Sequence, residues 1–397
     1  MKIYLVGGAV RDELMGVSGS DRDWVVVGAT PEDLIFEGYT PVGKDFPVFL
    51  HPQTGEEYAL ARTERKTAPG YHGFVFHADP SITLEEDLAR RDLTINAIAK
   101  DMEGQLIDPF KGVDDIKNRI FRHVSPAFKE DPVRILRLAR FAARYPEFTT
   151  ASETQALLKQ MCEDGEVDAL VSERIWQEIS KGLMSNSPYK MLEVLLECGA
   201  LEKLFPDLCQ VELSPAQLLD IKKALEWSSW LQAPLPIRFA VLDFLLPVAD
   251  QLKAPKDCTE LADLLKANFE RISICTTFSA KEILELLQSC DAFRRPERFD
   301  QLLIASECVS TIDKQKPEST IHISNTLNNL PDPYPQKIHL MKMLKSALSI
   351  DHKVIASEAI NNGLVAAEIG KAIEDARLNV LIETIVQLKT PQNTQET

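Results

Sequence analysis

The first 27 residues constrain the fold most, because they follow the pattern of a strand, a turn, a helix and a second strand. Two short apolar runs, residues 3–6 and 24–27, flank a pair of glycines and a helix-like segment. Asp21 and Asp23 lead into the second run. Alternate residues of an extended strand point to the same side, so these carboxylates project together while the arginine between them points away. The pattern predicts an N-terminal β-sheet with a carboxylate pair on one strand.

The glycine pair, Gly7-Gly8, and the two aspartates together suggest a site for phosphate and metal. Glycines let the backbone approach a phosphate closely, and the N-terminus of the following helix favours negative charge. Two convergent carboxylates are oxygen ligands of the kind that Mg²⁺ accepts. Alone, a Gly-Gly pair is most often a plain turn, and Asp-x-Asp is most often a solvated loop or a cap. Their conjunction in one unit favours phosphoryl or nucleotidyl transfer.

The composition excludes several classes of protein. A chain of 397 residues allows two to four domains, and its 45% apolar and 26% charged content is ordinary for a soluble globular protein. No signal peptide is evident, and the longest apolar run, residues 239–249, is broken by Asp243 and Pro247. The seven cysteines are scattered without a C-x-x-C, which indicates neither a zinc site nor a disulfide framework. We therefore expect a cytoplasmic protein with no membrane segment.

The chain changes character near residue 110. Strand-like runs at 3–6, 24–27, 48–50 and 58–61, the last two joined by a hairpin, predict a small mixed sheet with helices on one face. From residue 111 onward the apolar residues recur at helical spacing. The expected helices cover residues 132–144, 153–161, 172–183, 189–198, 216–230 and 280–290.

A second group of polar residues lies in the segment RRDLTINA, residues 90–97, which resembles a helix in its pattern. Arg91 can neutralise a triphosphate. Asp92 and Asn96 are four residues apart and would share one helical face, where an acceptor and a donor/acceptor suit ribose hydroxyls. The alternative is an amphipathic helix with an ordinary polar pair, and the segment alone does not separate the two.

A third group begins at Asp131 and continues with Arg134 and Arg137 at steps of three. An ionised aspartate only accepts hydrogen bonds and an arginine only donates them, so the pair can match the base-pairing edge of a nucleotide. Cytosine and adenine place an amine opposite the carboxylate, whereas guanine and uracil place a carbonyl there. The alternative is a helix with surface ion pairs, although four arginines within residues 134–144 weaken it.

The distribution of charge along the chain gives a second argument for contact with nucleic acid. A net charge of −16 opposes nonspecific binding to nucleic acids. Residues 111–145, however, hold nine Lys/Arg against four acidic residues. A solvated helix face is the usual explanation of such a run. The excess of arginine is suited to bidentate phosphate contacts, which here predicts a strip that contacts RNA phosphates.

The segments GGAVRD, DRDWVVVG, RRDLTINA and EDPVRILRLARFAAR resemble, in order and spacing, the motifs of bacterial class II tRNA nucleotidyltransferases, the CCA-adding enzymes. The segments VGKDFPVFLHPQT and EYALARTERK resemble gammaproteobacterial-type members of that family. The similarity covers residues 1 to about 208 and returns weakly at 291–302.

This resemblance implies an α+β protein in four parts. A nucleotidyltransferase head like that of DNA polymerase β would cover residues 1–110, a neck with the nucleotide-selecting helix 111–150, a helical body 151–210, and a helical C-terminal region 211–397. It implies catalytic Asp21 and Asp23 that bind Mg²⁺, and base selection by Asp131 and Arg134. The further nucleotide contacts that we expect are Gly8, Arg11, Arg91, Asp92, Asn96, Arg137 and Arg140. The implied reaction adds C, C and A to the 3′ acceptor end of tRNA from CTP and ATP and releases pyrophosphate.

Several alternatives stay open at this point. A bacterial poly(A) polymerase has nearly the same head, but Asp45 in Gly43-Lys44-Asp45 and the polar end of the chain favour CCA addition. A tRNA-binding protein with a retired active site is a second alternative, which the two retained aspartates oppose. Residues 237–245 look like the place of an HD phosphohydrolase motif, but apolar residues replace its His-Asp pair, so we expect no such metal site. Glu57 and Glu64 are both candidates for a third carboxylate, and the protein could be a monomer or a dimer.

Overall fold

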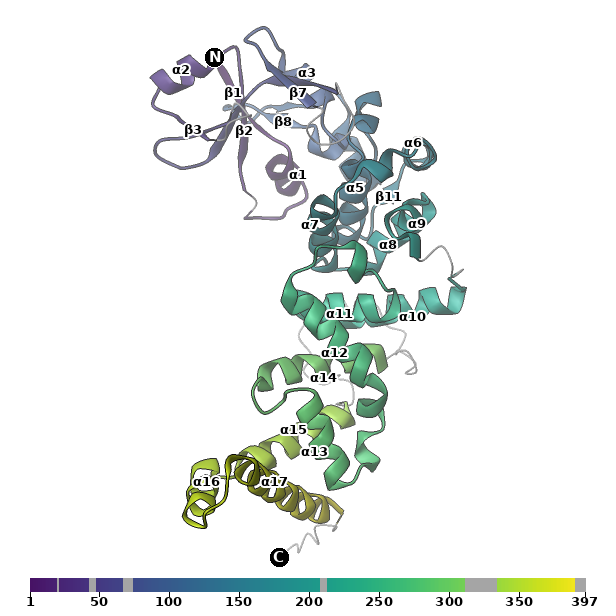
Figure 1. Cartoon of the computed structure of the whole chain (residues 1–397). Coiled ribbons are helices and arrows are strands. Elements are labelled where there is room, and N and C mark those ends of the chain that lie inside the picture. Colours follow the sequence, from purple (N-terminus) through teal and green to yellow (C-terminus); the bar gives the residue numbers. More distant parts are fainter. Residues whose placement is uncertain (20, 43–47, 67–73, 208–212, 311–333, 390–397) are drawn as a thin grey trace, which may run out of the picture. The chain divides into compact units, whose positions relative to one another are not determined.

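The computed structural model describes residues 1–19, 21–42, 48–66, 74–207, 213–310 and 334–389. It divides into two units, one of residues 1–212 with 251–253 and one of residues 213–250 with 254–397. The first unit holds a mixed sheet followed by helices and the second is helical, as Figure 1 shows, which confirms the expected α+β class. The finer division into head, neck and body stays a prediction.

The sheet has seven strands in the order β3-β4-β5-β2-β1-β8-β9. These strands are β1 (Lys2–Val6), β2 (Asp23–Val27), β3 (Thr40–Val42), β4 (Val48–Leu50), β5 (Glu57–Leu60), β8 (Ala99–Lys100) and β9 (Leu106–Ile107). The central strand, β2, pairs antiparallel with β1 and parallel with β5. A separate hairpin is formed by β6 (Arg62–Lys66) and β7 (Phe74–Ala78). The four strand runs expected from the sequence are therefore present.

Apolar cores lie on both faces of this sheet. Val25 packs with Leu88 of α3 (Leu84–Ala89) on one face. Val26, the next residue of β2, packs with Leu34 of α2 (Pro31–Phe36) on the other face. The expectation of helices on one face only is wrong, because Val25 and Val26 are both apolar and point to opposite faces, so each face of the sheet is covered by a helix. The third helix of this region, α1 (Gly8–Leu14), follows β1 directly.

The rest of the first unit is built around one helix. Helix α5 (Val133–Arg144) is apolar on the side that packs against α7 (Ser172–Leu183) and α8 (Pro188–Glu197). Its four arginines recur every three or four residues and lie only partly buried. The remaining elements are α4 (Gly112–Asn118), β10 (Ile120–Phe121), β11 (Thr149–Thr150), α6 (Ser152–Glu163) and α9 (Ala200–Leu204), with short 3₁₀ turns at Thr94–Asn96 and Pro126–Glu130.

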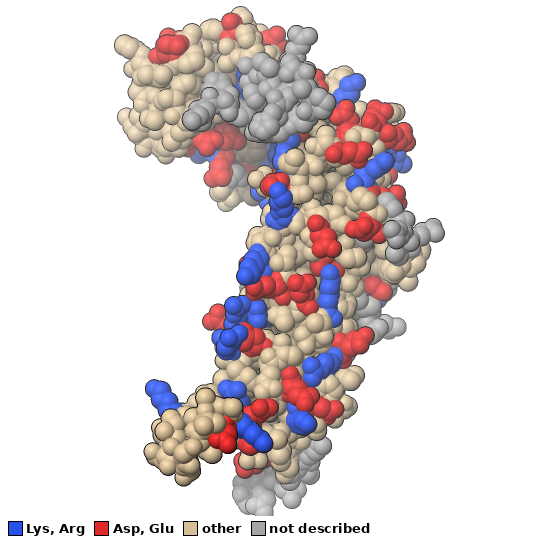
Figure 2. All heavy atoms as spheres, viewed as in Figure 1, with Lys and Arg blue, Asp and Glu red and all other residues tan. Residues whose placement is uncertain are grey.

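The second unit is a succession of helices on which acidic and basic side chains are interspersed (Figure 2). They are α10 (Pro215–Trp230), α11 (Leu235–Leu245), α12 (Lys256–Ser273), α13 (Ala280–Ser289), α14 (Pro296–Ser310), α15 (Pro335–Leu348), α16 (His352–Asn361) and α17 (Ala366–Lys389). The six helices expected from the sequence are all present, with ends shifted by at most two residues. No helix among the described residues is long and apolar enough to cross a membrane.

Residues 237–245, expected in place of an HD motif, lie within α11. Asp243 is buried there and accepts hydrogen bonds from the backbone N–H groups of Val248 (2.9 Å) and Ala249 (2.8 Å). Lys266 forms an ion pair with the same carboxylate at 2.6 Å. The side chain of Asp243 thus holds the end of its own helix, which gives it a structural role.

Candidate active site

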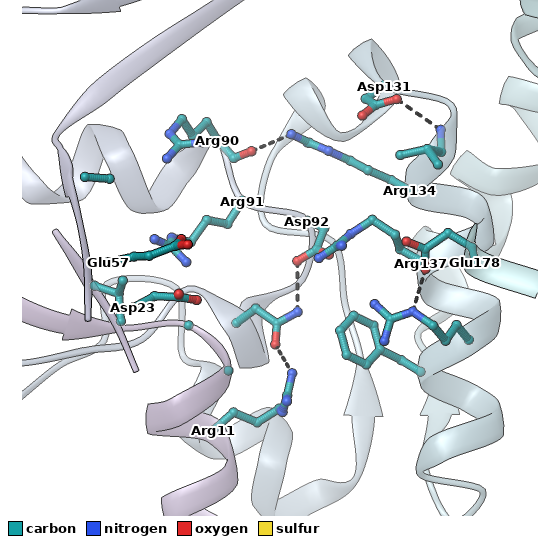
Figure 3. A pocket seen from close by; sticks show the side chains of 18 of the residues that line it. Arg11, Asp23, Glu57, Arg90, Arg91, Asp92, Asp131, Arg134, Arg137 and Glu178 are labelled. Atoms are coloured by element: carbon teal, nitrogen blue, oxygen red, sulfur yellow. Dashed lines mark hydrogen bonds and ion pairs between the residues drawn. The ribbon is translucent and has the colours of Figure 1, made fainter. Parts of the chain in front are cut away.

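Ten of the eleven residues predicted from the sequence line one pocket of about 640 Å³ in the first unit. These ten are Gly8, Arg11, Asp23, Arg91, Asp92, Asn96, Asp131, Arg134, Arg137 and Arg140. The exception is Asp21, which is exposed on the segment before β2 and does not line the pocket. Figure 3 shows the acidic wall formed by the sheet on one side and the arginines of α5 on the other.

Asp23 is the first residue of β2, and the parallel register places it opposite Glu57 on β5. The two carboxylates lie side by side in Figure 3, and both line the pocket. Burial raises the pKa of Asp23, nearby Arg91 opposes this, and the negative charges of Glu57 and Asp21 raise it further. Glu57 thus lies where a third carboxylate would be needed, whereas the side chain of Glu64 lies outside the described part, so the identity of the third carboxylate stays a prediction.

This carboxylate pair fits a hard divalent cation. Both members offer only oxygen ligands, and burial together with the negative charges of Glu57 and Asp21 raises the pKa of Asp23, so a cation would offset an unfavourable charge there. No group of three or more His, Cys, Asp or Glu side chains close enough to hold a metal occurs among the described residues. One or two carboxylates suffice for Mg²⁺ when phosphate oxygens and water complete its coordination.

The turn between β1 and α1 lies directly beside these carboxylates. Gly7 has a φ of 71°, in the left-handed region that glycine adopts readily. A Cβ at this position would lie 2.7 Å from Nη1 of Arg91, so the missing side chain also makes room for the guanidinium group. Gly8 begins α1 and presents its backbone to the pocket.

Arg91 is held against this turn by Asp87, a fully buried carboxylate of α3. Asp87 pairs with Arg90 at 2.9 Å and with Arg91 at 3.4 Å. Burial lowers the pKa of Arg91, although Asp87 opposes this. The Nε–H of Arg91 is buried and has no hydrogen-bond acceptor. A buried donor without a partner is costly, and a phosphate oxygen would satisfy it.

Asp92 and Asn96 are in contact as predicted, but the predicted helix is wrong. Helix α3 ends at Ala89, and only Thr94–Asn96 forms a 3₁₀ turn, which brings Asn96 Nδ2 within 2.9 Å of Asp92 Oδ1. Asp92 also pairs with Arg137 at 2.8 Å. Burial opposes ionisation of Asp92, yet Arg137 and these hydrogen bonds hold its pKa far below the usual range. Contact with a ribose stays a prediction for this pair.

Asp131 and Arg134 both face the pocket but do not pair with each other. Asp131 lies just before α5 and accepts a forked pair of hydrogen bonds from Arg174 of α7, at 3.1 and 2.8 Å. Arg134 donates to the backbone carbonyls of Ala127 at 3.0 Å and of Arg90 at 2.6 Å. The two predicted base-selecting groups are thus held by different partners in this structure.

Sequence reasoning missed the side chains that hold the predicted ones. Arg174 holds Asp131, and Glu178 accepts a hydrogen bond from Arg140 at 2.5 Å. Arg174 and Glu178 are four residues apart on α7, and both line the pocket. Their spacing on a predicted helix was the available signal, but it did not identify Asp131 and Arg140 as their partners.

The basic residues of the stretch 111–145 are divided between the pocket and the outer surface. The four arginines of α5 line the pocket. Arg122 pairs with Asp115 at 3.1 Å and also with Glu153. The exposed members are Lys111, Lys117, Arg119 and Lys129. These exposed side chains are the ones that RNA phosphates could reach outside the pocket, and their contact with RNA stays a prediction.

The fold and the pocket are those of a nucleotidyltransferase. The model of the Poly A polymerase head domain matches residues 3–122, and that of a probable RNA and SrmB-binding site of polymerase A matches residues 147–211. A Multifunctional CCA protein from Janthinobacterium sp. (strain Marseille) is 48% identical over 96% of this chain and 97% of its own length. One from Herminiimonas arsenicoxydans is 45% identical over 98% and 100%. The chain belongs to this family, the CCA-adding tRNA nucleotidyltransferases.

Solved structures of the family share the fold at low sequence identity. A CCA-adding enzyme in its apo form II is 23% identical, covers 98% of this chain and 91% of its own, and has a TM-score of 0.69. The Bacillus stearothermophilus CCA-adding enzyme in complex with CTP is 24% identical over 96% and 89%, with a TM-score of 0.67. The family resemblance inferred from the sequence motifs is confirmed. The segment that argued against poly(A) polymerase, Gly43-Lys44-Asp45, lies outside the described residues.

Proposed function

We propose that this protein adds C, C and A to tRNA 3′ ends from CTP and ATP without a nucleic-acid template, and releases pyrophosphate. The observation that carries the proposal is one pocket in which a carboxylate pair, a glycine turn and a row of arginines meet. Near-full-length relatives that carry the CCA name support the same conclusion. The work would take place in the cytoplasm, as the scattered cysteines predict.

The triphosphate would lie between the glycine turn and the arginines. The backbone of Gly8 and the unsatisfied Nε–H of Arg91 are suited to its oxygens. Asp23 and Glu57, with Asp21 nearby, would hold Mg²⁺. When bound there, this ion supplies a Lewis acid that favours attack of the 3′ hydroxyl on the α-phosphate and departure of pyrophosphate. The protein otherwise contributes orientation and charge neutralisation.

Base selection would use Asp131 as the acceptor for the amine of C or A and Arg134 as the donor to the neighbouring ring acceptor. Both side chains line the pocket next to the start of α5. Asp131 would share its carboxylate between Arg174 and the base. Arg134 would turn at least one N–H from a backbone carbonyl toward the base. In each case a hydrogen bond to the base would replace the contact that is given up, and no ion pair would be lost.

The test is to supply all four nucleotides, with Mg²⁺, to a tRNA that lacks its CCA end and to sequence the products. Products that end in CCA and stop there are expected. Runs of A would instead identify a poly(A) polymerase. Binding of tRNA without incorporation would indicate a tRNA-binding protein with a retired site.

A further inference from the structure

One buried carboxylate next to the pocket belongs to no part of the predicted site. Asp12 lies on α1 with 2% of its surface exposed. It accepts hydrogen bonds from Arg11 Nε at 2.8 Å and from the Tyr145 hydroxyl at 2.8 Å. Arg144 completes the cluster with a hydrogen bond at 3.0 Å. A carboxylate is buried to this extent only when charge and hydrogen bonds compensate for its lost hydration.

Asp12 fixes the guanidinium group of Arg11 on one side. On another side, Arg11 Nη1 donates to Asn96 Oδ1 at 2.5 Å. The guanidinium also lies 5.1 Å from the ring centre of Phe141 and 5.4 Å from that of Tyr145. Arg11 is only 4% exposed but lines the pocket, so its remaining edge has a defined direction.

The same cluster joins two functional elements of the first unit. Helix α1 begins directly after Gly7, at the turn suited to phosphate. Helix α5, which carries the selecting arginines, ends at Arg144, and its next residue is Tyr145. Asp12 therefore connects the phosphate turn to the C-terminal end of α5, while Asp92 contacts the middle of that helix through Arg137.

We propose that Asp12 is a positioning residue for nucleotide addition. It holds Arg11 toward the triphosphate and sets the separation between the glycine turn and α5. This inference rests on the proposed function, because it takes CTP and ATP as the ligands of the pocket. It assigns to Asp12 an effect on nucleotide binding that a residue needed only for folding does not have.

The experiment compares Asp12→Asn with wild type in the full chain. The amide keeps the size of the side chain but removes the negative charge that Arg11 and Arg144 contact. KM and kcat are measured separately for CTP, for ATP and for tRNA, beside the melting temperature. We expect KM for both nucleotides to rise about tenfold or more, since a charge-assisted contact is lost, while KM for tRNA changes less than twofold. Asp12→Glu, which keeps the charge, should recover part of the nucleotide affinity.

A matched control is Glu13→Gln, on the same helix. Glu13 is exposed and forms an ion pair with Lys100 at 2.5 Å, but it does not line the pocket. Its kinetic constants should equal those of wild type. An Asp12→Asn protein that folds and keeps its nucleotide KM, or loses kcat alone, would overturn the inference.

If Asp12→Asn does not fold, Tyr145→Phe decides the question, because it removes one donor to Asp12 and no charge. A rise of a few-fold in nucleotide KM with unchanged tRNA KM supports the inference, and unchanged nucleotide KM overturns it. Absence of CTP and ATP incorporation by wild type would instead refute the proposed function. The two failures are therefore distinguishable in one assay.

Discussion

Asp131 gives the sharpest test of template-free base selection, because its loss should change which base is added. Asp131→Ala removes the acceptor for the exocyclic amine of C or A, and it also removes the charge that repels the carbonyl of U or G. Losing one charge-assisted hydrogen bond costs roughly 1.5–3 kcal/mol. Since about 1.4 kcal/mol corresponds to a factor of ten, CTP-over-UTP discrimination should fall by about one to two orders of magnitude.

The contacts of Asp131 also indicate how Asp131→Ala affects the stability of the protein. Asp131 is paired with Arg174, and the two side chains are 19% and 23% exposed. Removing one partner of a pair that is mostly buried costs up to several kcal/mol, so the melting temperature of Asp131→Ala is measured beside its kinetics. Glu173→Ala is the matched control, because Glu173 is the neighbour of Arg174 on α7 and forms an exposed ion pair with Lys253 at 2.6 Å.

The assay measures kcat/KM for CTP and for UTP on a tRNA that lacks its CCA end, with each variant at the same folded concentration. Glu173→Ala should keep the wild-type ratio. If Asp131→Ala slows all four nucleotides equally and the CTP-to-UTP ratio is unchanged, base selection by this carboxylate is refuted. The start of α5 would then be a structural or phosphate-binding element.

Three further outcomes are expected from other parts of the chain. Asp23→Asn should abolish incorporation of both nucleotides, but its melting temperature in EDTA should be no lower than that of wild type. Because the folded pKa of Asp23 is raised, folding favours its protonated carboxyl; this contribution to stability is present at low pH and is lost as pH rises through that pKa, so the ionised group adds none. Lys117→Glu, a reversal of an exposed charge, should weaken tRNA binding more than CTP binding and reduce its salt dependence; equal weakening would contradict a tRNA contact. The protein should hydrolyse neither 2′,3′-cyclic AMP nor p-nitrophenyl phosphate with Ni²⁺, Mg²⁺ or Mn²⁺, and turnover with any of these metals would contradict the expected lack of an HD metal site at residues 237–245.

The sequence predicted those parts of the site that depend on local order. The strand, glycine turn and helix at the N-terminus are set by neighbours in the chain, and residues 3–6 and 24–27 form strands as expected. The arginines of α5 were predictable for the same reason, since their spacing and the apolar side of the helix are local features.

Contacts between distant segments could not be predicted in this way. The parallel register that places Glu57 beside Asp23 depends on pairing across more than thirty residues, and nothing in either strand specifies it. The expected helix at residues 90–97 fails because Asp92 is drawn to Arg137, and Leu93 is fully buried and forms a β-bridge with His123. Tertiary contacts therefore override a local helical pattern in this segment.

The pocket also explains how an acidic chain can hold a triphosphate. The net charge is −16, yet among the described residues nine arginines and five acids line the pocket, an excess of four positive charges. Most of these arginines contact a carboxylate, such as Asp87, Asp92 or Glu178, that fixes their direction. The carboxylates thus weaken the attraction of the pocket for phosphate. They also hold the arginine side chains in fixed directions, which reduces the entropy lost on binding. The field at the site depends on this local excess in a partly desolvated cavity, so the net charge of the chain does not indicate its ligand.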